Sequence, residues 1–243
     1  MGSLVVGSPT MRNPRLGLLL FAFAPSLAAC NAAVDPINVN AGCPEQPLRG
    51  PAQFAPASPQ SVIDDFEDGD LLLPRIAGRS GSWYPFPLAA ATAVGMASRD
   101  CPAHGTWSGH FTATGAADGA VNWNTTMIDP FSAVIPYDAS AWSGFSFWIA
   151  AGDSLTLPMD TSVGVTTTDV LDAGGVCTMC NDYHLVQDIP LTRTWTRWSF
   201  RFDELAQKGF GLPQVPLRKD RLVNFIFWPK QIDFWIDDFR FEP

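Results

Sequence analysis

Between Ser61 and Pro243 the chain alternates short apolar runs with turn residues, and this pattern limits the fold more than any other feature. In "SGFSFWIAAG", Phe145, Phe147 and Ile149 fall on one face of an extended strand, and the intervening residues fall on the other. Further strand candidates are residues 61–66, 109–115, 119–124, 131–136, 161–168, 194–202, 221–229 and 232–241, with one helical turn or short helix expected over 203–209. The sequence shows no long amphipathic helix and no internal repeat. It therefore predicts an all-β fold, a two-sheet antiparallel β-sandwich.

The N-terminal region has the layout of a secretory signal. Residues 11–30, "MRNPRLGLLLFAFAPSLAAC", place two arginines before an apolar run that ends in small residues. The run is too short and wrongly flanked for a stable membrane span. Its end, "LAAC", resembles a bacterial lipobox, which implies cleavage before Cys30 and lipidation of the Cys30 thiol. An ordinary signal peptide followed by a disulfide-forming Cys30 is the alternative.

We divide the chain into a lipoprotein signal peptide over 1–29, a Pro-rich tether over 30–60 and a β-domain over 61–243. Met11 already begins a complete signal, so residues 1–10 read as an upstream extension. Residues 31–60 contain six prolines and little hydrophobic periodicity, which indicates an extended, irregular segment. We expect a lipid-anchored protein of the cell envelope. Asn31, where an aspartate would resemble an inner-membrane retention signal, favours the outer membrane.

Export to an oxidising compartment favours disulfides for the four cysteines that remain. "CTMC" lacks the βαβ setting of a redox motif, and the chain has no second ligand pair at the spacing of a zinc site. We predict that Cys177–Cys180 closes a loop and that Cys43–Cys101 pins the N-terminal segment to the domain. The sequence leaves other pairings open.

Charge and motifs argue against several classes of function. The net charge of -9 argues against nucleic acid as a partner, because phosphate binding needs a basic surface. The sequence has three histidines, no G-x-S-x-G elbow and no H-E-x-x-H zinc motif. Glycoside hydrolysis needs two carboxylates across a cleft, and no E-x-D-x-E-type run occurs on a single predicted strand. We therefore expect no enzyme activity.

Three stretches carry a resemblance to a known fold. "VIDDFEDGD", "YDASAWSGFSFWIAAG" and "FWIDDFRFEP", in this order and spacing, resemble the galactose-binding-domain-like β-jelly-roll of bacterial carbohydrate-binding modules. The segment from Gly174 to Gly211 also looks like bacterial surface lipoproteins of this type. The resemblance covers roughly Ser61 to Pro243. It implies a non-catalytic module that binds polysaccharide or another glycan, although this fold hosts many binding functions.

The same resemblance implies a structural calcium that joins the first and last strands. Calcium takes six to eight oxygen ligands, so acids from both ends of the domain are plausible partners. Glu67 and Asp237 are the main expected ligands, with Asp65 and Asp68 in support. Simple alternation along the last strand places Asp237 on the face of Phe239 and Phe241. Solvated carboxylates at the strand ends, or ion pairs with Arg75 or Arg240, are the alternative.

The aromatic residues supply candidates for a sugar-stacking platform. Trp83, Trp107, Trp123 and Trp195 lie beside turns or polar residues, so we predict an exposed platform from them, with core packing as the alternative for each. In "CNDYH", Asp182 and His184 are expected at the rim of a groove, in a loop held by the disulfide. Three functions remain open: a glycan-binding module, an envelope protein–protein interaction module, and a jelly-roll polysaccharide-degrading enzyme.

Overall fold

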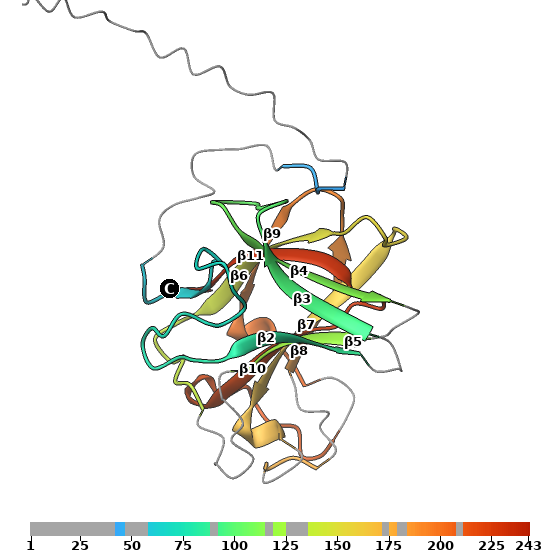
Figure 1. Cartoon of the computed structure of the whole chain (residues 1–243). Coiled ribbons are helices and arrows are strands. Elements are labelled where there is room, and N and C mark those ends of the chain that lie inside the picture. The colour runs from blue at the N-terminus through green and yellow to red at the C-terminus, as the bar shows by residue number, and fades with distance from the viewer. Residues whose placement is uncertain are drawn as a thin grey trace, which may run out of the picture. The chain divides into compact units, whose positions relative to one another are not determined.

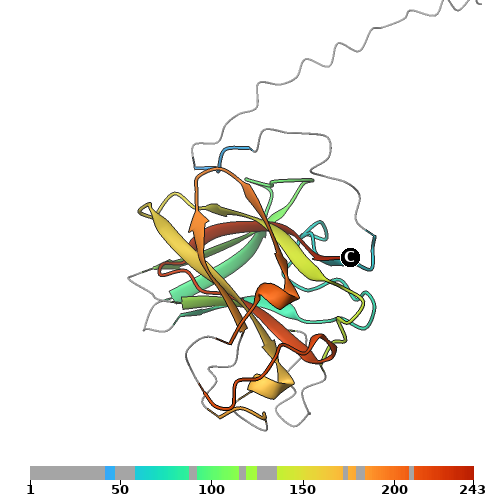
Figure 2. The same cartoon turned by 180° about the vertical axis from the view of Figure 1, so that it is seen from behind.

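The computed structural model describes residues 42–46, 58–87, 92–114, 119–124, 136–171, 175–178, 184–207 and 211–243. Over these residues the chain forms two antiparallel sheets stacked face to face (Figures 1 and 2). The first sheet has the order β3 (Thr92–Ser98), β4 (Ser108–Thr114), β11 (Asp233–Glu242), β6 (Gly144–Ala151) and β9 (Thr196–Arg201), with β1 (Val62–Asp64) also paired to β11. The second has the order β2 (Ser82–Pro87), β5 (Gly119–Asn124), β10 (Leu222–Phe227), β7 (Met159–Thr167) and β8 (His184–Leu191). The predicted all-β sandwich is confirmed.

The helices among the described residues are three short 3-10 turns, η1 (Thr168–Val170), η2 (Phe202–Glu204) and η3 (Lys219–Arg221). Of the helical turn or short helix expected over 203–209, the turn is present as η2, which begins one residue earlier. Ala206 then pairs with Leu185 of β8 through two backbone hydrogen bonds, so the turn does not continue into a longer helix. None of the described helices is long and apolar enough to span a membrane.

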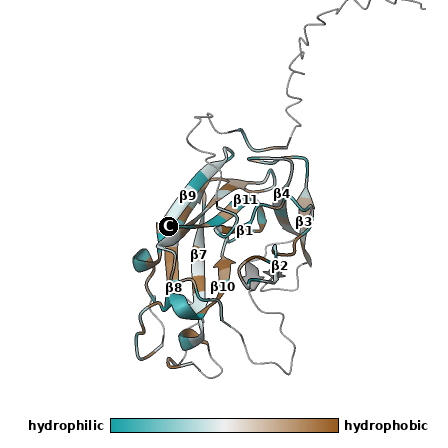
Figure 3. Ribbon diagram, turned by 90° about the vertical axis from the view of Figure 1, so that its left-hand side faces the viewer, coloured by the Kyte–Doolittle hydropathy of each residue, from teal (hydrophilic) through white to brown (hydrophobic). Residues whose placement is uncertain are grey.

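The core between the sheets consists largely of phenylalanine. Phe145 on β6 meets Phe225 on β10 edge to face at 4.8 Å, and Phe239 on β11 meets Phe225 in the same way at 4.8 Å. Edge-to-face pairs place the positive ring edge against the negative ring face, which adds stability beyond area burial. β10 appears mostly in brown in Figure 3 because its side chains are nearly all apolar.

The outer face of the first sheet carries a second apolar cluster. Trp148, Trp195 and Trp235 pack there with Cys101, Ala103 and Cys43. The Cys43–Cys101 disulfide lies over them, with Cα atoms 5.3 Å apart, as the sequence predicted. This cover explains why every residue of β6 is buried although its side chains alternate between two faces.

The N-terminal segment Gly42–Gln46 is held on this sheet by more than the disulfide. Glu45 donates its backbone N–H to the carbonyl of Arg193 at 2.6 Å and accepts the N–H of Trp195 at 3.0 Å. The Gln46 amide donates to the carbonyl of Pro102 at 2.8 Å. These five residues of the expected tether therefore belong to the folded domain.

Candidate functional site

A β-bulge decides where the acids of the last strand point. The register of β11 against β6 shifts between Asp237 and Arg240, and Asp238 has a φ of 50°. The extra residue reverses the alternation. Asp237 is therefore paired with Trp148 on the outer face, and Phe239 returns to the core. The expectation that Asp237 shares a face with Phe239 and Phe241 is wrong for this reason.

Asp237 and Glu67 both bind the backbone of one loop, Ala103–Trp107. Oδ2 of Asp237 accepts the N–H groups of Ala103 at 2.9 Å and His104 at 3.0 Å. Oε1 of Glu67 accepts the N–H groups of Thr106 at 2.8 Å and Trp107 at 3.0 Å. Acids from both ends of the domain thus meet at the same five residues, which lie just after the disulfide-bonded Cys101.

This meeting point is electrostatically strained. Burial raises the pKa of Asp237 well above its usual value, the two loop amides oppose that rise, and the charges of Glu67 and Asp65 add to it. Burial also raises the pKa of Asp68, with neighbouring aspartates contributing. Carboxylates that raise one another's pKa are close together, as the sequence indicated for these acids.

The same contacts bear on the predicted calcium. Both oxygens of Asp237 and one of Glu67 already accept backbone N–H groups, and Asp65 accepts the N–H of Glu67 at 3.3 Å. Within the described ranges, no group of three or more Asp, Glu, His or Cys side chains is arranged to hold a metal ion. These side chains alone do not supply the six to eight oxygens that calcium takes. Calcium between β1 and β11 stays a prediction.

The other acids of the first and last strands also have protein partners. Asp64, fully buried, accepts the backbone N–H of Phe66 at 2.8 Å and the indole N–H of Trp83 at 2.7 Å. Burial raises the pKa of Asp64, and these two hydrogen bonds oppose the rise. Asp238 forms an ion pair with Arg240.

A serine, an aspartate and a histidine meet at Asp233, in an order that does not suit nucleophilic catalysis. Asp233 accepts hydrogen bonds from the backbone N–H of Ser154 at 2.7 Å and from its hydroxyl at 2.5 Å. The other Asp233 oxygen lies 2.9 Å from Nε2 of His110, whose ring stacks on Trp235 at 3.7 Å. Burial raises the pKa of Asp233, but the bonds from His110 and Ser154 outweigh it and leave the pKa below its usual value. In a catalytic triad the histidine, not the aspartate, contacts the serine.

Two of the four tryptophans of the predicted aromatic platform are buried. Trp83 is 3% exposed and Trp195 is 2% exposed, so neither indole can stack on a glycan. Trp83 packs against four phenylalanine rings of the core, and Trp195 lies under the Cys43 segment. Trp107 is half-buried beneath the guanidinium of Arg99, 4.4 Å from its ring. The backbone of Trp123 pairs with Trp83 and Phe225, and its side chain lies outside the described part.

The residues predicted for the rim of a groove also differ from the prediction where the structure describes them. His184 is buried, its Nε2 lies 2.9 Å from the carbonyl oxygen of Val215, and burial lowers its pKa. The prediction that His184 lies at the rim of a groove is therefore wrong. Cys177 is disulfide-bonded and accepts a hydrogen bond from Gln207 at 3.0 Å. Asp182, Cys180 and Cys30 lie outside the described residues.

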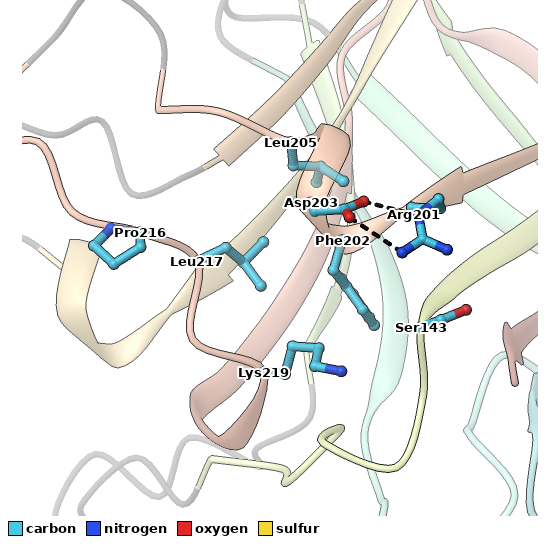
Figure 4. Close-up of a pocket in the computed structure, with 8 residues that line it drawn as sticks. All are labelled: Ser143, Arg201, Phe202, Asp203, Leu205, Pro216, Leu217 and Lys219. Atoms are coloured by element: carbon cyan, nitrogen blue, oxygen red, sulfur yellow. Dashed lines mark hydrogen bonds and ion pairs between the residues drawn. The ribbon is translucent and has the colours of Figure 1, made fainter.

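Two further features lie on the surface of the described residues. Tyr84 on β2, 37% exposed, is the one aromatic residue among the well-exposed large apolar side chains of the described part. It pairs across the second sheet with Asn122. Elsewhere, a pocket of about 410 Å³ lies where β9 runs into η2 (Figure 4). Its lining is Ser143, Arg201, Phe202, Asp203, Leu205, Pro216, Leu217 and Lys219.

The pocket has apolar walls and a charged rim. Phe202, Leu205, Pro216 and Leu217 supply the walls. Arg201 and Asp203 form a double hydrogen bond, with Nε to Oδ1 at 3.0 Å and Nη2 to Oδ2 at 3.1 Å, drawn as dashed lines in Figure 4. No sequence motif singles out these residues, because three separate segments build the pocket.

The fold, two antiparallel sheets with the first and last strands paired, is that of the β-sandwich carbohydrate-binding modules. This confirms the resemblance drawn from the sequence. The chain is similar to the family 11 carbohydrate-binding module from Clostridium thermocellum in complex with a β-1,3-1,4-mixed-linked tetrasaccharide. The TM-score is 0.50, with 16% identity over 75% of this chain and 94% of that one.

Other solved structures are similar at lower scores. The solution structure of CtCBM11 has 17% identity over 76% of this chain and 97% of that one, with a TM-score of 0.47. The C-terminal family 22 module of Clostridium thermocellum Xyn10B has 13% identity over 76% and 96%, with a TM-score of 0.39. No protein-family model and no curated protein sequence matches the chain.

Proposed function

We propose that the chain is a non-catalytic glycan-binding protein, exported and held at the cell envelope, at the outer membrane, by a lipid on Cys30. The observation that carries the binding function is the sandwich itself, which is similar over 75% of this chain to 94% of a module solved with a bound tetrasaccharide. Asp233 lies between Ser154 and His110, so these three side chains do not form a nucleophilic triad. The Cys43–Cys101 disulfide agrees with an oxidising compartment.

A glycan array probed with the purified full chain tests this proposal. The array includes the mixed-linked β-1,3-1,4 tetrasaccharide and xylohexaose. Glycans without β-linked glucose or xylose serve as negative controls. We expect saturable binding to at least one of the array's polysaccharides or oligosaccharides. Binding to none of them, at protein concentrations up to the millimolar range, would contradict the proposal.

One observation favours a protein partner as the second candidate. Val94 and Met96 are 47% and 50% exposed on β3, which is the edge strand of its sheet. An exposed apolar edge can pair with another chain. Two results together would support this alternative. The wild-type chain would bind no glycan, and it would co-purify with one envelope protein that is lost when Val94 and Met96 are both changed to threonine.

A further inference from the structure

The geometry points to the pocket beside η2 as the site of one pyranose residue, and we propose that it takes a neutral glycan at a chain end. This inference rests on the proposed glycan binding and names the pocket in which the glycan would bind. A volume of about 410 Å³ lies at the low end of the range for small-molecule sites, roughly 300–1,000 Å³. The pocket therefore has room for a single sugar residue rather than a long bound stretch of polymer.

The rim offers hydrogen-bonding groups in a pattern that suits sugar hydroxyls. The paired Arg201 and Asp203 hold each other in one plane and leave free guanidinium N–H groups next to free carboxylate lone pairs. Each hydroxyl of a vicinal pair both donates and accepts, so adjacent donors and acceptors match it. The opposite charges of Arg201 and Asp203 compensate each other, so this pair does not require a charge on the sugar.

Lys219 is the third polar group at the pocket. Its ammonium group donates to the carbonyl oxygens of Trp142 at 2.6 Å and Ser140 at 3.2 Å. An ammonium has three N–H donors, so one is left for a ligand hydroxyl. The Ser143 hydroxyl already donates to the carbonyl oxygen of Pro243, so it offers a ligand acceptor lone pairs alone. A sugar ring lying with its C–H face on Leu217 would direct its hydroxyls to Lys219 and the Arg201–Asp203 pair.

The pocket is built before any ligand arrives, because backbone hydrogen bonds tie its three segments together. Phe202 donates its N–H to the carbonyl of Ser143 at 3.0 Å, and Ala139 donates to Lys219 at 2.8 Å. Glu204 fixes the start of η2 by accepting the N–H of Arg201 at 2.9 Å. A pre-formed site loses less entropy on binding.

Saturation-transfer NMR with methyl β-D-glucopyranoside, methyl β-D-galactopyranoside and methyl β-D-xylopyranoside tests the site. We expect at least one of these single pyranoses to bind saturably to the full chain. Leu217→Trp, which fills the pocket, and Asp203→Ala, which changes only an exposed side chain, should each raise Kd at least tenfold. Tyr84→Ala, on the other sheet, is the matched control and should leave Kd within twofold.

The outcomes separate this inference from the broader one. If array oligosaccharides bind but all three single pyranoses do not, or if binding is lost in Tyr84→Ala and kept in the pocket variants, the pocket assignment is wrong and glycan binding stands. If neither oligosaccharides nor single sugars bind, both are wrong. Because Leu217 is half-buried, unchanged melting of Asp203→Ala is the check that lost binding does not reflect unfolding.

Discussion

Asp237→Ala is the substitution that best tests how the acids of the last strand stabilise the fold. The carboxylate accepts three backbone N–H groups, from Ala103 at 2.9 Å, His104 at 3.0 Å and Asp238 at 2.6 Å. Ala103 and Asp238 are buried, whereas His104 is exposed and can be solvated. Alanine therefore leaves two buried donors without their acceptor.

The expected size of the effect follows from these contacts. An unsatisfied buried donor costs about 1–3 kcal/mol, so two cost about 2–6 kcal/mol. Removing a buried carboxylate that Glu67 and Asp65 repel offsets part of this cost. We expect the free energy of unfolding to fall by about 2–4 kcal/mol at pH 7. Urea unfolding followed by tryptophan fluorescence measures it.

Asp160→Ala is the matched control, because Asp160 is exposed on β7. It should stay within about 0.5 kcal/mol of wild type. A loss below about 0.5 kcal/mol in Asp237→Ala as well would refute the view that this carboxylate holds the Ala103–Trp107 loop.

The pH dependence gives a second readout of Asp237. Its folded-state pKa is raised, so the folded protein binds the proton more tightly than the unfolded chain does. The stability that this proton contributes is complete below the unfolded pKa and is lost as pH rises through the folded value. The contribution of Asp237 to stability should therefore increase as pH falls from 7 toward about 4, whereas the lowered pKa values of His184 and Asp233 act in the opposite direction. Asp237→Asn should flatten that slope, leaving the similar contribution of Asp64. Parallel profiles for the two proteins would contradict the assignment.

Three further changes have definite expected outcomes. Changing both Cys43 and Cys101 to serine removes a crosslink between residues 58 apart in the sequence. Loop entropy predicts that the free energy of unfolding falls by about 4 kcal/mol. A fall of less than about 1 kcal/mol would contradict a stabilising role of this disulfide. Cys30→Ser should leave an unprocessed or soluble precursor, and normal membrane fractionation would contradict lipidation. For the predicted calcium, EDTA should lower the melting temperature and calcium chloride should restore it; a melting curve indifferent to both would leave the loop amides as the partners of Glu67 and Asp237.

The fold was accessible from the sequence because side-chain alternation survives wherever a strand is regular. β6 and β9 have the faces that their alternation predicts, with Phe145 and Phe147 inward and Arg197 and Ser199 outward. Three strands were missed: β2 because its prolines, in "SWYPFP", read as turn residues, β3 because its small residues carry a weak apolar signal, and β8 because polar residues and a proline interrupt "HLVQDIPL". The bulge at Asp238 was missed because alternation assumes an uninterrupted register.

The candidate site was harder to predict, for a physical reason. Flanking polar residues made Trp83 and Trp195 look exposed, yet burial of an indole depends on what covers it in space. Asp64 satisfies the indole N–H of Trp83, and Cys43, distant in sequence, covers Trp195. The pocket at Arg201 and Asp203 joins residues from three segments, so no single stretch carries its signal.

The most direct test of glycan binding is isothermal titration of the full chain with the strongest oligosaccharide from the array, followed by chromatography of that oligosaccharide. A non-catalytic module predicts saturable binding at one site per chain and an oligosaccharide recovered intact after prolonged incubation. No heat of binding in the presence of a folded protein, or steady conversion to shorter products, would contradict it.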